Sequence, residues 1–174
     1  MNDPSRILVV FYSRSETTAA LAGQIVDRLG GDCERLHEVE SGRRAGLAGY
    51  VRSIVDVIRG HTASLQPMTH APRDYDLVVI GTPVWAGRTS TPVATWLAQH
   101  ASELRRTAFF CTMGGSGSQK AFAQMQQVAR SVPVATCALC ARDVQKDVAI
   151  ETVNGFVSEI RNALAPRERA SAGQ

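Results

Sequence analysis

Apolar and polar positions follow two different patterns along this chain. An unbroken apolar run occurs at residues 7–12, and short, mainly apolar runs occur at 75–82, 107–112 and 134–140. Runs of this length are typical of strands that are covered on both faces of a sheet. A fifth, more polar segment at 33–39 shows weak alternation and indicates an edge strand.

Between these segments, apolar residues recur at spacings of three and four, as they do on one face of an α-helix. Five helices are expected in chain order: one that ends at Gly30, one across residues 43–59, one that begins at Thr91–Pro92, one through residues 122–129, and one capped by Asp147.

The regular alternation of strand and helix predicts an α/β fold, in which helices cover both faces of a parallel sheet. We expect one domain over residues 1–165 and a disordered polar tail at 166–174. In such sheets, ligands bind at the carboxyl ends of the strands. Three loops fall there, at residues 13–18, 82–88 and 112–118, and they form the candidate site.

The first loop brings hydroxyl groups to the start of a helix, where unpaired amides and the positive dipole end favour an anion. It contains no glycine and no Gly-Lys-Ser/Thr, so it matches neither a dinucleotide fingerprint nor a P-loop. It suits a single terminal phosphate, although ordinary helix capping would use the same residue types. Its residues are Ser13, Arg14, Ser15, Glu16, Thr17 and Thr18.

The other two loops suit a flat ligand. Trp85 could stack against a flat ring, or it could fold back onto the core. The glycines of the third loop could let backbone amides approach the polar edge of such a ligand, or they could simply form a flexible turn. The candidate residues of the second loop are Pro83, Val84, Trp85, Ala86 and Gly87. Those of the third are Thr112, Met113, Gly114, Gly115, Ser116 and Gly117.

Composition narrows the classes of partner. The net charge of +3 is only mildly basic, and no Lys/Arg cluster is interleaved with aromatics, so a nucleic-acid groove is not expected. No signal peptide or membrane span is recognisable, which predicts a cytoplasmic protein with reduced cysteines. Cys137 and Cys140 lie in a predicted strand, where residues three apart point to opposite faces, so a structural role is favoured over a redox or metal pair.

Three stretches resemble the flavodoxin family. Tyr-Ser-Arg-Ser-Glu-Thr-Thr after Ile-Leu-Val-Val-Phe is similar to the phosphate loop for flavin mononucleotide (FMN). Gly-Thr-Pro-Val-Trp-Ala-Gly-Arg and Phe-Phe-Cys-Thr-Met-Gly-Gly-Ser-Gly are similar to the two loops around the isoalloxazine ring. The likeness runs from residue 6 to residue 164. It implies a doubly wound, five-stranded parallel sheet with strand order 2-1-3-4-5.

The resemblance also implies where FMN would lie. It places Ser13, Ser15 and Thr18 on the phosphate, and residues 83–87 and 112–117 around the ring. Glu16 departs from the family pattern, which has glycine at that position. Because a carboxylate repels a phosphate, Glu16 must point away from the phosphate if FMN binds, and a positive φ there would suit glutamate poorly.

Two classes of function follow. The first is an FMN-dependent redox protein. It could be an electron carrier with a redox protein as its partner, or an NAD(P)H-dependent reductase of a small acceptor such as a quinone. Arg88 could meet an anionic donor, and many relatives form homodimers. No catalytic side chain and no metal site is expected. The second class, favoured by Glu16, is a flavodoxin-fold module that binds no flavin and acts in interaction or regulation.

Overall fold

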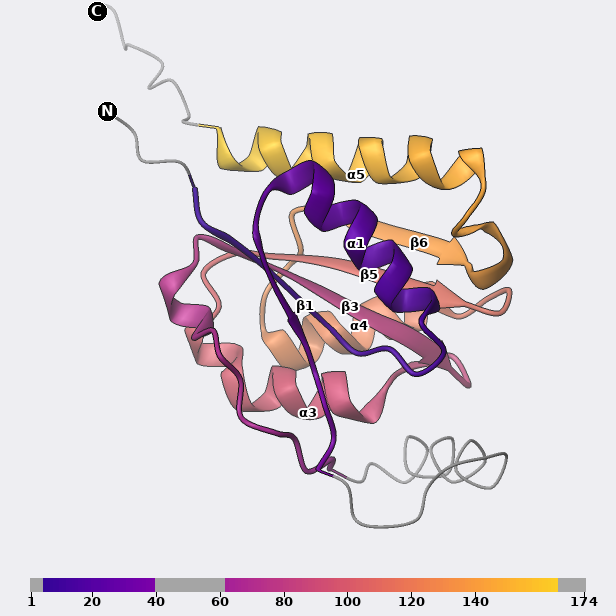
Figure 1. Ribbon diagram of the computed structural model, residues 1–174. Helices are drawn as coiled ribbons and strands as arrows, with labels where there is room; N and C mark the ends of the chain where they lie inside the picture. The colour runs from indigo at the N-terminus through magenta and orange to yellow at the C-terminus, as the bar shows by residue number, and fades with distance from the viewer. Residues whose placement is uncertain (1–4, 40–61, 166–174) are drawn as a thin grey trace, which may run out of the picture.

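The computed structural model describes residues 5–39 and 62–165 (Figure 1). The helix expected across 43–59 and the tail at 166–174 lie outside these residues. The elements are β1 (Ile7–Phe11), α1 (Thr17–Leu29), β2 (Asp32–Arg35), β3 (Leu77–Trp85), β4 (Arg88–Thr89), α3 (Thr91–His100), β5 (Thr107–Met113), α4 (Ser118–Ala129), β6 (Thr136–Cys140) and α5 (Asp147–Leu164). Among the described helices, none is long and apolar enough to cross a membrane.

The main sheet is parallel and has the order β2-β1-β3-β5-β6. Since β5 and β6 are the fourth and fifth strands of the predicted set, the expected order 2-1-3-4-5 is confirmed. A further two-residue strand, β4, pairs antiparallel with β3 and was not predicted. The carboxyl ends of β1, β3 and β5 therefore meet at one edge of the sheet.

Two apolar layers explain the unbroken apolar runs. In β1, Ile7, Val9 and Phe11 face one buried cluster. Leu8 and Val10, which alternate with them, face the other. Helices α1 and α5 cover the first face, and α3 and α4 cover the second (Figure 1). A strand that is buried on both sides has no polar face, which is why these strands appear in the sequence as apolar runs and not as an alternating pattern.

Several boundaries differ from those expected. Strand β2 spans four residues, because the chain leaves the sheet once the Leu36 amide has bonded to the Phe11 carbonyl. Ser90 rather than Thr91 precedes α3 as its N-cap, and Lys146 rather than Asp147 precedes α5. Asp147 instead lies in the first turn of α5, where a carboxylate interacts favourably with the helix dipole.

The second loop is shorter than the sequence indicated. Strand β3 continues through Pro83 to Trp85 and turns back into β4, so only Ala86 and Gly87 form the turn. Pro83 is tolerated inside β3 because β1 ends opposite Gly81, which leaves no ladder with β1 for a proline to break. Both turn residues have positive φ, the geometry of a tight two-residue hairpin.

Candidate functional site

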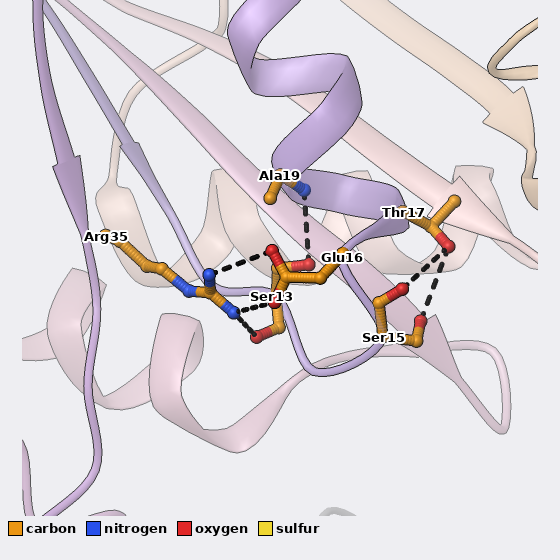
Figure 2. A network of polar contacts seen from close by, with 6 residues as sticks. All are labelled: Ser13, Ser15, Glu16, Thr17, Ala19 and Arg35. Atoms are coloured by element: carbon orange, nitrogen blue, oxygen red, sulfur yellow. Dashed lines mark hydrogen bonds and ion pairs between the residues drawn. The ribbon is translucent and has the colours of Figure 1, made fainter.

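The first loop closes on the start of α1. Ser13 is buried, and its Oγ accepts a hydrogen bond of 3.1 Å from the amide of Ala19 (Figure 2). Glu16 then adopts the left-handed conformation, with φ at 61°, immediately before the first helical residue. Helix geometry leaves the amides of Thr17 and Thr18 without intrahelical acceptors. The loop thus presents backbone donors at a helix N-terminus.

An arginine from β2 neutralises the carboxylate of this loop. The Arg35 guanidinium contacts both carboxylate oxygens of Glu16, at 2.5 and 3.0 Å, and also donates to the Ser13 carbonyl at 2.8 Å (Figure 2). The hydrogen bond from Arg35 lowers the pKa of the Glu16 carboxyl, which keeps it ionised. The carboxylate is therefore turned toward Arg35, as phosphate binding would require.

Arg35 was not among the predicted site residues. It lies directly opposite Phe11, the last residue of β1, in the parallel register of β1 and β2, and therefore beside the start of the first loop. The signal that could have found it is the register between β1 and β2, which sets Arg35 beside the end of β1.

The hydroxyl groups of the first loop have different roles. Ser15 Oγ lies 3.4 Å from Thr17 Oγ1, on the exposed side of the loop (Figure 2). Thr18 is instead buried, and its Oγ1 is hydrogen-bonded at 2.7 Å to Oγ1 of Thr112 on β5. Ser15 is thus exposed and Thr17 half-buried, and both hydroxyls lie at the loop surface, while the buried Thr18 joins the first loop to the third. Arg14 is exposed beside them.

The second and third loops touch through two glycines. Gly117, which precedes α4, has φ at 105°. A Cβ added there would lie 2.8 Å from Gly87 Cα and 3.1 Å from a methyl carbon of Val84. The close approach of the two backbones therefore requires glycine at 117. Met113 ends β5 half-buried, while Gly114, Gly115 and Ser116 form the exposed tip of the third loop.

Trp85 lies between the core and solvent. It is half-buried, and its ring meets the ring of Tyr12 edge-on with centroids 6.0 Å apart. Tyr12 follows β1, and its hydroxyl donates to Glu38 at 2.8 Å. Burial, and then the hydrogen bond to Glu38, raises the pKa of Tyr12, so the phenol stays protonated. The aromatic pair thus connects the first two loops, and the role of Tyr12 was not predicted.

The cysteines are free thiols. Burial raises the pKa values of Cys111 and Cys137 to about 12, so both are protonated at neutral pH and are poor nucleophiles. Cys140 is half-buried at the end of β6. Among the described residues, no group of His, Cys, Asp and Glu side chains is arranged to hold a metal ion. The carboxyl edge of the sheet therefore carries hydroxyl and amide donors together with the aromatic side chain of Trp85.

Comparison with known proteins defines the class. The family model described as Flavodoxin matches residues 6–156. Since that match covers most of the chain, the protein belongs to the flavodoxin family. No match was found among curated proteins.

Solved structures share the fold. A flavoprotein from Lactobacillus acidophilus NCFM, solved with FMN, is 23% identical and covers 78% of this chain and 92% of its own, with a TM-score of 0.63. A candidate flavoprotein from Bacteroides eggerthii DSM 20697 is 20% identical, covers 90% and 98%, and has a TM-score of 0.72. Oxidised Flavodoxin 1 from Bacillus cereus is 14% identical, covers 92% and 100%, and has a TM-score of 0.57.

Proposed function

We propose that this protein binds FMN and acts in redox chemistry. The observation that carries the proposal is that the three strand-end loops are joined into one edge. Thr18 bonds to Thr112, and Gly87 packs against Gly117. An FMN-bound relative with the same fold gives further support.

The residues present fit the cofactor. Ser15, Thr17 and the first amides of α1 would hold the phosphate, with Ser13 and Arg35 fixing the loop around it. Trp85 would cover one face of the ring and exclude water from it. Amides of residues 114–117 would bond its polar edge. Bound FMN would supply one- and two-electron chemistry, and the protein would position it and tune its potential.

A fluorescence titration tests this proposal, because FMN emission is quenched on binding beside an aromatic ring. Wild-type protein should bind FMN and be yellow. The S15A/T17A variant removes the two hydroxyls proposed to hold the phosphate, and we expect FMN affinity to fall about tenfold or more. The matched control T152A/S158A removes two hydroxyls that bond only to carbonyls of α5. It should bind as tightly as wild type.

The proposal has two versions, an electron carrier and an NAD(P)H-dependent reductase, which differ in their electron donor. Carrier flavodoxins are strongly acidic, which suits basic partners, whereas this chain has a net charge of +3. That difference favours an NAD(P)H-dependent reductase acting on a small acceptor. Stopped-flow mixing of the FMN-loaded protein with NADPH, without any partner protein, should bleach the flavin absorbance. A flavin that stays oxidised would exclude the reductase version.

One observation favours a different class. Glu16 carries a positive φ where the family has glycine, so the loop has a strained residue and a negative charge at the proposed phosphate site. A protein built this way could serve as an interaction or regulatory module without flavin. The FMN titration decides, since a colourless protein that leaves FMN fluorescence unchanged would overturn the redox proposal.

A further inference from the structure

A depression lies beside the Ala86–Gly87 turn, between β4 and α4. Apart from the turn, its lining is Arg88, Lys120, Gln124, Gln127 and Val128. No acidic side chain belongs to this lining. The depression adjoins the second loop, and none of the phosphate-loop residues 13–18 belongs to its lining.

Thr89, which lies next to Arg88 in β4, fixes one of the lining side chains, Gln124. Its amide donates to Gln124 Oε1 at 3.1 Å, and its Oγ1 donates to the Ala121 carbonyl at 3.1 Å. Thr89 is buried, so these bonds hold β4 firmly on α4. Because Oε1 of Gln124 accepts the Thr89 bond, the other end of that amide is an NH2 group that carries only donors.

Two cationic side chains add further hydrogen-bond donors to the lining of the depression. Arg88 and Lys120 are both exposed, and neither forms an ion pair among the residues that the structure describes. The Lys120 stem runs along the turn, since its Cδ lies 3.9 Å from where a Cβ on Gly87 would be. Guanidinium, ammonium and amide groups therefore surround one concave surface, which is the donor set that binds multiply charged oxyanions.

We propose that this depression binds the diphosphate, or an equally charged group, of a small electron donor or acceptor. The proposal rests on FMN binding at the neighbouring loops, because the Ala86–Gly87 turn would then border the flavin ring. A molecule that exchanges electrons with the ring could then approach it beside this turn. The only charged side chains that line the depression beside it are positive, so an anionic partner is attracted and held there.

Binding is tested with inorganic pyrophosphate, followed by amide NMR shifts of the full chain with and without saturating FMN. We expect saturable shifts of the Gln124 side-chain NH2 and the Gly87 amide in both states, with affinity reduced about tenfold in R88Q/K120Q. The control R73Q/R105Q removes the same charge at the amino ends of β3 and β5 and should bind like wild type. Absence of shifts at Gln124 and Gly87, or equal affinity in all three proteins, would overturn the proposal.

Reactivity is tested separately with the reduced, FMN-loaded protein. Anionic ferricyanide and neutral benzoquinone each oxidise the flavin in stopped-flow. Relative to R73Q/R105Q, the R88Q/K120Q variant should react about three- to tenfold more slowly with ferricyanide at low salt and unchanged with benzoquinone. Equal rates with ferricyanide would contradict an anion subsite that serves the flavin. Failure to load FMN would instead contradict the redox proposal, while the pyrophosphate titration would still decide the subsite.

Discussion

Glu16 adopts a conformation that most side chains avoid, with φ at 61° at the entrance to α1. The left-handed region costs a residue with a Cβ about 1–2 kcal/mol relative to glycine. The contacts with Arg35 offset little of this cost, because the Glu16 side chain is 69% exposed and such pairs are weak in water. What these contacts do is turn the carboxylate toward Arg35 on β2.

Substituting Glu16 separates strain from charge. In E16G, both the strain and the carboxylate are lost, so we expect stability to rise by about 0.5–1 kcal/mol and FMN to bind severalfold more tightly. In E16Q, the strain remains, so only FMN affinity should rise. Urea unfolding and fluorescence titration measure the two effects. If E16G bound FMN no better than wild type, Glu16 would not oppose the phosphate.

Among the elements, the β3–β4 hairpin and the loop before α4 depend on each other. The turn at Ala86–Gly87 and the loop end at Gly117 approach so closely that no side chain fits between them. Thr89 joins the same hairpin to α4. Two of the three candidate loops are thus one packed unit rather than flexible connections.

A single methyl group tests this unit. In G117A, the added Cβ would meet Gly87 at 2.8 Å and take a φ of 105°, so we expect a loss of about 2–4 kcal/mol in the free energy of unfolding. In G115A, the added Cβ has no atom within 4 Å and no positive φ, so stability should stay within about 0.5 kcal/mol. Equal losses in the two variants would show that the loops do not pack as described.

These elements also show what the sequence could predict. Apolar runs identified β1, β3, β5 and β6, because residues buried on both faces leave a signal that needs no tertiary knowledge. The polar edge strand β2 was indicated only by weak alternation at 33–39. The hairpin was missed because its turn has Ala86 where Asn, Asp or Gly is usual, and because Pro83 suggested that the strand had ended. Arg35 was missed because its place beside the first loop depends on the register between two strands.

At the scale of the whole molecule, the edge strand β2, which carries Arg35, is anchored by the carboxylate of Glu34. Glu34 on β2 accepts bonds from the amides of Thr69 and His70 and from Nδ1 of His70. Its side chain is only 12% exposed. These bonds join β2 to the segment that precedes β3, far along the chain, and so fix the edge from which Arg35 reaches the first loop.

This anchor predicts a pH dependence of stability. Burial alone would raise the pKa of Glu34, but the bonds from Thr69 and His70 outweigh it and lower the pKa below its usual 4.5. Because the folded state then binds its proton more weakly than the unfolded state, Glu34 stabilises the fold above pH 4.5, and that stabilisation is lost as the pH falls through the lowered pKa. E34Q should therefore be about 1–2 kcal/mol less stable than wild type at pH 7, and it should lose less further stability than wild type on acidification.

Urea unfolding between pH 7 and pH 3 measures how the free energy of unfolding of wild type and E34Q changes with pH. The control is E151Q, which removes an exposed carboxylate of α5. Parallel slopes for wild type and E34Q would show that Glu34 is not a carboxylate on which the acid stability of this fold depends.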